Sequence, residues 1–384
     1  MHLLKFICLS SLCVCTLCAC RHDEYVTYMI TEDTGSSPSA ASATGVTGLY
    51  VLNEGNMGAN KCTLDYLDLS STDGSVPYYR NIYAQRNPDV VLELGDVGND
   101  IGIYGSRLWM VINCSNKVEV CDAATTRRLG QVNISNCRYL AFDGGYAYVS
   151  SYAGPVQVSE NCALGRVYKV DTLTLQAIDS VTVGYQPEEM AILDHHLYVA
   201  NSGGYRVPRY DDRISVIDLT TFRMTGELTV GINLHRMQAD AHGQLWVSSR
   251  GNYADVAPSL WWIRPDTGQT GQLSVPVSAM TLVGDSLYYI GTSYSMTTGG
   301  YTKDFGIIDV TTHQPLTTSL FDDAHVTAMT LPYGIIVNPY ARDFYLMDAK
   351  NYVSSGELLH FLPDGSFDYK VWTGDIPSRG AFRL

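Results

Sequence analysis

Residues 167–183 read VYKVDTLTLQAIDSVTV, and this stretch decides the fold. Apolar residues alternate with polar ones up to Asp171, a Thr-containing turn follows, and a second short alternating run ends the segment. Alternation with a period of two predicts a β-strand whose one face is buried. An aspartate at the start of a turn can accept a hydrogen bond from the backbone N–H two residues later. The segment therefore predicts a β-hairpin with a structural aspartate in its turn.

The same pattern recurs along the chain at intervals of 43 to 55 residues. A repeat of this length is typical of arrays and propellers, in which each copy is one supersecondary unit. We interpret the seven turn aspartates as structural residues with no catalytic role. They are Asp68, Asp122, Asp171, Asp218, Asp266, Asp309 and Asp364.

A second motif precedes each copy, and it is a strand that ends in small polar residues. LYVANSGG at 197–204 is an example, and the inner segment PEEMAILD at 187–194 lies before it. Each unit thus contains four short strands, A to D, without a crossover helix. Radial repetition of such units predicts an all-β, seven-bladed β-propeller with four antiparallel strands per blade.

The two ends of the chain predict how the ring closes. The last ten residues, DIPSRGAFRL at 375–384, resemble an A strand, and TGLYVLNEG at 47–55 resembles a B strand. Pairing of the two would complete one blade from both termini. In the seventh blade, residues 334–349 fit either an A–B pair or a B–C pair.

The composition is that of a folded, acidic protein. Of 384 residues, 46% are hydrophobic and 17% charged, and the net charge is −14. A uniformly acidic chain is a poor match for a nucleic-acid backbone, so we expect no nucleic-acid partner. The 27 tyrosines suit half-buried strands and also ligand-binding surfaces, because the ring packs while the hydroxyl stays hydrated.

The first twenty residues, MHLLKFICLSSLCVCTLCAC, predict an export signal. One lysine precedes an apolar stretch that is too short for a convincing membrane span. The end of this segment resembles a bacterial lipobox, which would make Cys20 the lipidated first residue of the mature protein. We therefore expect a signal peptide at 1–19, a lipidated cysteine and flexible tether at 20–47, and the propeller at 48–384. A cleaved, soluble export signal is the alternative.

Five cysteines lie beyond this leader, and disulfides are possible outside the cytoplasm. The predicted positions of Cys114 and Cys137, near one rim of blades two and three, favour a disulfide between them. A pair formed by Cys62 and Cys162 is the weaker alternative. None of these five has CxxC spacing with nearby histidines, so we expect no zinc site.

One face of the predicted ring is the candidate binding face. The B–C connections are long, whereas the A–B and C–D connections are short, and long loops on a rigid scaffold often carry function. The B–C loops contain tyrosine rings and the hydrogen-bond donors of arginine and asparagine. Such groups suit a large, flat, partly apolar ligand that bears amides, or an oligosaccharide. In the alternative interpretation these tyrosines only pack loop against loop. The candidate residues are Met57, Tyr152, Tyr185, Tyr205, Arg206, Arg209, Arg250, Asn252, Tyr253, Tyr294 and Tyr352.

The export signal, GLYVLNEGN at 48–56 and the segment at 332–365 together resemble a known family. They resemble Bacteroidetes surface lipoproteins of the seven-bladed, YncE-like propeller type, often called surface layer proteins. The resemblance implies a lipid-anchored protein on the outer membrane, exposed at the cell surface. It further implies capture of cobalamin or a related corrinoid and delivery to an outer-membrane TonB-dependent transporter, without a cofactor.

Other functions remain open in the sequence. His235 beside Arg236, and His325 after the acidic pair Asp322–Asp323, are candidates for acid–base chemistry in a lactonase- or lyase-like enzyme. Tandem acids such as Asp211–Asp212 could hold calcium. However, the chain contains no nucleophile elbow, HExxH motif or phosphate loop, so we expect a protein that is not an enzyme. A surface scaffold that binds glycan or protein is the main alternative.

Overall fold

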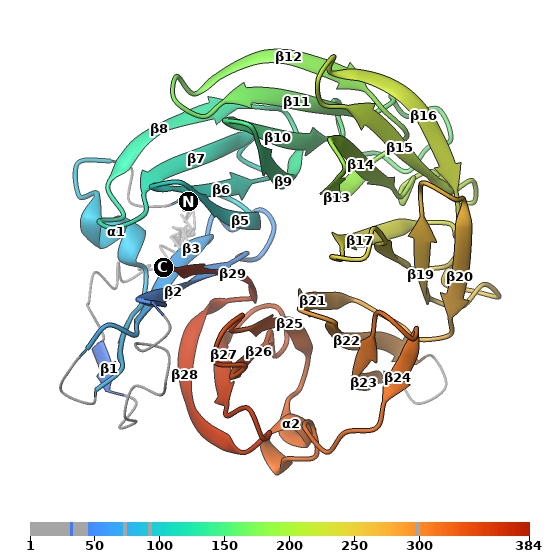
Figure 1. Cartoon of the computed structure of the whole chain (residues 1–384). Coiled ribbons are helices and arrows are strands. Elements are labelled where there is room, and N and C mark those ends of the chain that lie inside the picture. Colours follow the sequence, from blue (N-terminus) through green and yellow to red (C-terminus); the bar gives the residue numbers. More distant parts are fainter. Residues whose placement is uncertain (1–30, 34–44, 72–74, 91–93, 296–299) are drawn as a thin grey trace, which may run out of the picture.

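The computed structural model is a closed ring of seven β-sheets around a central axis (Figure 1). It describes residues 31–33, 45–71, 75–90, 94–295 and 300–384. The expected signal peptide and Cys20 lie outside the described residues. The predicted seven-bladed β-propeller of four-stranded antiparallel blades is confirmed.

Each blade runs from an inner strand at the axis to an outer strand at the edge of the ring. In that order, blade one contains β29 (Pro377–Arg383), β2 (Gly48–Asn53), β3 (Thr63–Asp68), β4 (Pro77–Tyr79) and β1 (Thr31–Asp33), and blade two contains β5 (Gly98–Tyr104), β6 (Arg107–Ile112), β7 (Lys117–Asp122) and β8 (Arg128–Asn133). Blade three contains β9 (Cys137–Asp143), β10 (Tyr146–Ser151), β11 (Arg166–Asp171) and β12 (Gln176–Thr182). Blade four contains β13 (Pro187–Leu193), β14 (His196–Asn201), β15 (Arg213–Asp218) and β16 (Arg223–Thr229). Blades five to seven contain β17 (Leu234–Ala239), β18 (Leu245–Ser249), β19 (Ser259–Arg264) and β20 (Gln269–Leu273); β21 (Ala279–Val283), β22 (Ser286–Ser295), β23 (Gly300–Asp309) and β24 (Gln314–Leu316); and β25 (Pro332–Val337), β26 (Phe344–Asp348), β27 (Ser355–Phe361) and β28 (Phe367–Asp375).

The ring closes as the sequence predicts. The C-terminal strand β29 pairs antiparallel with β2, with Leu49 opposite Phe382, so one blade is built from both ends of the chain. Blade seven uses β25 as its inner strand and β26 as its second strand, which decides the open question in favour of the A–B pair. The pairing gives blade one its inner strand and closes the ring.

The core lies between neighbouring blades. Apolar side chains from adjacent sheets interdigitate, and the two largest fully buried side chains, Trp109 and Trp246, belong to B strands. One such cluster joins blades one and two through Tyr50, Leu108 and Met110, which are all at most 1% exposed. Because each sheet is packed on both faces, its B strand is apolar along most of its length.

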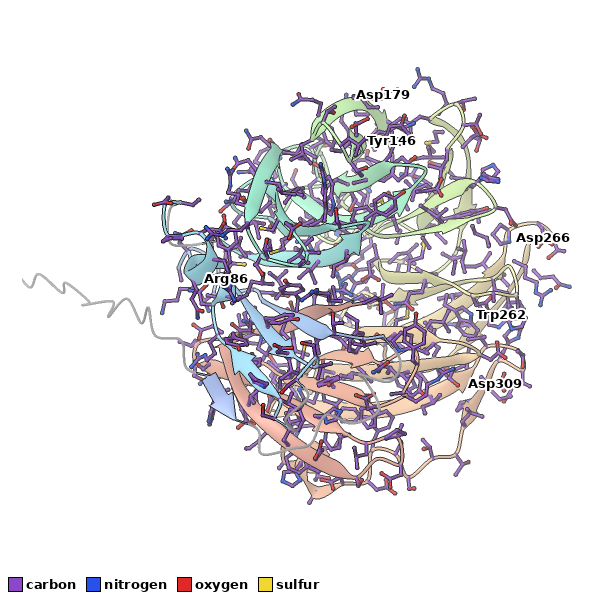
Figure 2. All side chains as sticks on the ribbon, turned by 60° about the vertical axis from the view of Figure 1, so that its left-hand side comes forward. Arg86, Tyr146, Asp179, Trp262, Asp266 and Asp309 are labelled. Atoms are coloured by element: carbon purple, nitrogen blue, oxygen red, sulfur yellow. The ribbon has the colours of Figure 1, made fainter. Side chains whose placement is uncertain are left out.

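The turn aspartates have the predicted structural role in six of the seven repeats. Asp122, for example, accepts from the backbone N–H groups of Ala124 and Thr125 at 3.1 and 2.8 Å, and from the Thr125 hydroxyl. Matching bonds occur at Asp68, Asp171, Asp218, Asp309 and Asp364. Figure 2 places Asp266 and Asp309, both from C–D turns, at one border of the molecule, and Arg86, from a D–A connection, at the opposite one.

Two short helices and one short strand are added to the ring. The helices α1 (Ile82–Arg86) and α2 (Ala324–Ala328) interrupt the D–A connections that lead to blades two and seven. Strand β1, within the expected tether, pairs with β4 at the outer edge of blade one. No helix in the described part of the chain is long and apolar enough to cross a membrane.

Candidate functional site

The innermost strands share a backbone irregularity at one end of the central channel. In six of the seven blades the pairing of the A strand with its B strand shifts register near the start of the A strand. Such β-bulges re-aim side chains and are common beside functional sites. In this ring they present polar and aromatic residues toward the D–A and B–C connections. We call these residues the inner belt: Asp100, Arg138, Tyr139, Glu188, Glu189, His235, Arg236, Tyr333 and Arg379.

Glu188 organises one half of the inner belt. Its side chain is 1% exposed and accepts from Arg138 at 3.0 Å, Arg250 at 3.2 Å and the Tyr152 hydroxyl at 2.8 Å. Burial favours the neutral acid, but the two guanidinium groups and the hydroxyl outweigh it and lower the pKa of Glu188. A carboxylate this well paired is ionised and fixed in position.

Glu189 organises the other half. One oxygen faces Arg236 at 3.4 Å and also bonds Arg379, while the second accepts from the backbone N–H of Met237 at 2.8 Å. Arg379 lies 3.9 Å from Asp100 as well. Burial raises the pKa of Asp100 to about 6, although Arg379 opposes the shift. The belt therefore alternates cations and anions from neighbouring blades.

Tyr139 stands at the centre of the cations. The carbons of the Arg138, Arg236 and Arg379 guanidinium groups lie 5.5, 5.7 and 5.4 Å from its ring centroid. Its hydroxyl is 3.1 Å from His235 Nε2. Burial and the nearby arginines, Arg236 first, hold the pKa of His235 well below its ordinary value, so this imidazole is neutral.

A smaller cluster lies at the junction of blades one and seven. The Tyr333 hydroxyl donates to Glu54 at 3.2 Å, and the ring of Tyr333 meets that of Tyr352 edge-on at 5.7 Å. Burial raises the pKa of Glu54. The backbone carbonyl of Tyr352 accepts from Asn56 at 2.8 Å, which ties the B–C connections of blades one and seven together.

We call the B–C connections the rim, because they surround the mouth of the inner belt. The rim comprises residues 54–62, 113–116, 152–165, 202–212, 250–258 and 349–354.

Several predicted site residues come together around blades three to five. Tyr152 is 7% exposed and meets Tyr205 edge-on at 6.3 Å. The Arg206 guanidinium stacks on Tyr185, 3.7 Å from its centroid, and Arg250 reaches from the rim to Glu188. These contacts connect the rim to the inner belt.

Two other predicted residues are held out into solvent. Tyr253 is 72% exposed and Met57 is 70% exposed. Tyr253 has φ of 60°, and Tyr352 has φ of 64°, a left-handed conformation that strains a bulky side chain. Leu175 and Phe222 adopt the same conformation in C–D turns of the opposite face, so it does not by itself mark a ligand site. Neither burial nor backbone preference explains a tyrosine at position 253, although its ring contacts Tyr210 at 6.4 Å.

The remaining predicted residues play other parts. Asn252 accepts from the backbone N–H groups of Ala254 and Val256 and so shapes its own loop. Arg209 is 72% exposed and pairs with Glu160 at 3.3 Å on the outside of the rim. The connection predicted around Tyr294 is a hairpin instead, and Tyr294 lies on β22 opposite Tyr301 of β23.

Exposed apolar side chains gather on the rim. Of the large apolar residues that are exposed in the described part of the chain, nine lie in B–C connections and two in A–B or C–D connections. The nine are Met57, Val156, Val158, Leu164, Tyr205, Val207, Tyr253, Val256 and Val353. Apolar groups concentrated on one face mark an interaction site.

The cysteine pairing is corrected by the structure. All five described cysteines are free thiols, so neither the Cys114–Cys137 nor the Cys62–Cys162 disulfide is present. The two segments of the first pair do lie together, because Asn113 donates to the carbonyl of Cys137 at 2.9 Å. The Cys137 thiol, however, is turned into the core, 3.3 Å from the carbonyl of Lys117.

The two acidic pairs and His325 also differ from their suggested roles. Asp211 is 3% exposed and binds Arg213 through both carboxylate oxygens, at 2.8 and 2.9 Å. Asp323 caps α2 and accepts from His325, whose ring stacks on Phe367 at 3.7 Å. This places His325, on α2, at the outside of the ring, away from the inner belt (Figure 1). No cluster of His, Cys, Asp or Glu suited to a metal occurs among the described residues.

Sequence reasoning missed most of the inner belt. Its residues lie within segments interpreted only as inner strands, yet a pattern was available. Blades three to five each place two polar or aromatic residues directly after the first residue of the A strand, in CRYLAFD, PEEMAIL and LHRMQA. A strand that should be buried does not tolerate such pairs without a specific use.

Comparisons with known proteins agree with the fold. A selenium-binding protein from Sulfolobus tokodaii, described as hypothetical, has a TM-score of 0.64 at 13% identity, with 90% of this chain and 96% of that chain covered. A quinonprotein alcohol dehydrogenase-like protein from Bacteroides thetaiotaomicron has a TM-score of 0.54 at 13% identity (88% and 78% covered). Kuenenia stuttgartiensis hydrazine synthase has 0.54 at 17% identity (68% and 76% covered). These likenesses show the fold alone.

No protein-family model matches the chain, and no curated protein matches it either. Propellers serve many functions, so the fold does not decide between them, and the inner belt and the rim are the features that can.

Proposed function

We propose that this protein is a binding propeller that captures cobalamin or a related corrinoid on the rim. It would be anchored at the cell surface and would pass the ligand to an outer-membrane TonB-dependent transporter. The resemblance to the YncE-like surface lipoproteins suggests this ligand class and this partner. The proposal assigns the protein no chemical step, and His235 serves as a packed, neutral partner of Tyr139.

The observation that carries the proposal is the exposed ring of Tyr253 on the rim. At 72% exposure the ring of Tyr253 gains little from burial in the folded protein, so we infer that a ligand covers it. Tyr205 lies on the neighbouring B–C connection and is 37% exposed. Tyrosine rings supply large, rigid contact area to a flat ligand with amide substituents, because the hydroxyl can bond while the ring packs.

Arg250 of the rim, held by Glu188 of the inner belt, supplies the polar half of the proposed site. Arg250 is the member of the Glu188 cluster most open to the rim, with 26% of its side chain exposed. A guanidinium offers five donors, which suits amide oxygens and a phosphodiester. Because Glu188 already holds Arg250 in place, ligand binding does not have to order the Arg250 side chain and loses less conformational entropy.

A second candidate function is that of a surface scaffold that binds a protein or a glycan. The nine exposed apolar side chains of the rim favour it, since they extend over five B–C connections. A protein partner would cover this whole surface, whereas a corrinoid would cover the part around Tyr205 and Tyr253.

The test is a calorimetric titration of the purified protein with cobalamin. Saturable one-to-one binding with a micromolar or lower Kd supports corrinoid capture. No heat and no change in the cobalamin absorbance at millimolar ligand would overturn it and would favour the scaffold function. Adenosine monophosphate at the same concentration is the control for binding through a phosphate or base alone.

A further inference from the structure

A pocket of about 330 Å³ lies at blade six, separate from the inner belt. Its walls come from strand β23 and from the D–A connection that carries α2. The lining residues are Tyr301, Lys303, Phe305, Phe321, Val326 and Thr327. Ligand pockets generally start at about this volume, so the space suits a single ring or a short chain.

Two elaborations of blade six create this pocket. Strands β22 and β23 are ten residues long, whereas the second and third strands of every other blade have five to seven residues. The connection from β24 to β25 spans residues 317–331 and contains α2. Positions 301, 303 and 305 alternate along β23, so all three side chains share the face that the connection covers.

The deeper part of the pocket is apolar. The rings of Phe305 and Phe321 stack with centroids 5.5 Å apart, and Phe321 in turn meets the buried Phe344 edge-on at 5.5 Å. Val326 is 2% exposed and closes this end. An aromatic or aliphatic group placed there would exchange water for hydrocarbon contact.

The open end of the pocket carries one positive charge. The Lys303 ammonium donates to the backbone carbonyls of Thr327, at 3.3 Å, and Met329. An ammonium has three donors, so one remains for an anion. Two acids on the same elements are directed elsewhere: Asp304 lies on the opposite face of β23 by alternation, and the Asp323 carboxylate accepts from His325.

We propose that this pocket is a second binding site, for small carboxylates with one aromatic ring or a short aliphatic body. The body packs on Phe305 and Phe321, and the carboxylate pairs with Lys303. The site is separate from the proposed corrinoid site, because neither Tyr205 nor Tyr253 lines it.

The test uses 4-fluorophenylacetate as the probe, followed by fluorine NMR of the purified protein. We expect saturable binding that Lys303→Met weakens at least tenfold, because methionine keeps the stem and removes the charge. Thr327→Trp should fill the pocket and abolish binding. Lys61→Met, on the rim of blade one, is the matched control and should leave the Kd unchanged.

Two outcomes would overturn the proposal. One is the absence of saturable binding at millimolar probe, and the other is binding that both Lys303→Met and Thr327→Trp leave unchanged. The neutral analogue 4-fluorophenylacetamide should bind at least tenfold more weakly, and equal affinity would contradict the assigned role of Lys303. Cobalamin titrations of Lys303→Met should match the wild type, so failure of this site is distinguishable from failure of the proposed function.

Discussion

The two faces of the ring connect the same strands with different kinds of loop. On the A–B and C–D face, one short turn with an aspartate recurs around the ring, and its carboxylate is consumed by the backbone of its own turn. On the D–A and B–C face, the connections differ in length and sequence and expose apolar side chains. Repetition is what stability alone requires. Departure from repetition therefore indicates where function lies.

The largest expected effect is on stability, when an ion pair of the inner belt is broken instead of one on the rim. Glu188→Ala should lower the free energy of unfolding by about 3–5 kcal/mol, because Arg138 would remain buried without its partner. Glu160→Ala removes the exposed partner of Arg209 and should cost about 1 kcal/mol or less. Urea denaturation followed by tryptophan fluorescence measures both. Equal losses would show that the inner belt is no more tightly built than the rim.

A smaller effect concerns pH and the buried His360. Burial alone would lower its pKa, but hydrogen bonds to Asp343 at 2.9 Å and Asp368 at 3.0 Å outweigh burial and raise the pKa. A raised pKa means that the stabilisation is complete below the ordinary value of 6.5 and is lost as the pH rises through the folded value. The loss should not exceed about 3 kcal/mol, the upper range for a hydrogen bond to a charged group.

Urea denaturation at pH 6 and pH 9 measures this loss. His360→Gln should flatten the pH dependence between these values. His196→Gln is the matched control at a less buried histidine and should leave the slope as it is. A wild-type stability that does not fall over this range would contradict a charged His360.

A still smaller effect is expected at the repeated turns. The Thr311 hydroxyl and the backbone N–H groups of Thr312 and Thr311 lower the pKa of Asp309 to about 2. This stabilisation is present above the ordinary pKa of 3.8 and is lost as the pH falls through about 2. Asp309→Ala should therefore lower the Tm slightly at pH 7, and the difference should shrink toward pH 2.

Asp266→Ala is the control for that prediction. Asp266 lies in the C–D turn of blade five, where Arg264 holds the strand position that Asp309 has in blade six. No side-chain hydrogen bond to Asp266 occurs among the described residues around it. Its removal should change the Tm less than removal of Asp309. A larger change at Asp266 would mean that the turn bonds are not what stabilises this face.

The smallest expected effect concerns the chemical reactivity of the cysteine thiols, not stability. Iodoacetamide should modify the half-buried Cys114 and Cys162 in the native protein and spare Cys62, Cys121 and Cys137, which are at most 1% exposed. Burial also raises the pKa of Cys137 to about 12. Peptide mass mapping measures the labelling. Failure of Cys114 and Cys137 to react after unfolding without reductant would reinstate the disulfide.

The fold could be predicted because its repeat is local. Strand alternation and a turn aspartate such as Asp171 are both visible within one segment, and the C-terminal strand could be paired with β2 because each lacks a partner in its own blade. The inner belt could not be predicted in the same way. Glu188, Arg138 and Arg250 come from three consecutive blades, and only the packing of these blades around the axis brings them together. The disulfide between Cys114 and Cys137 was mispredicted for a related reason. The sequence places the two segments side by side, but the direction of the Cys137 thiol depends on core packing.

We propose that the rim around Tyr205 and Tyr253 binds a corrinoid. The most direct measurement is the calorimetric affinity for cobalamin of the double variant Tyr205→Ala/Tyr253→Ala, beside Tyr340→Ala. Tyr340 is 53% exposed in an A–B connection of the opposite face. Anchor aromatics contribute about 2 kcal/mol or more each, so the double variant should bind at least about 700-fold more weakly. Tyr340→Ala should bind as the wild type does. Unchanged affinity in the double variant, or equal weakening in both proteins, would contradict the claim.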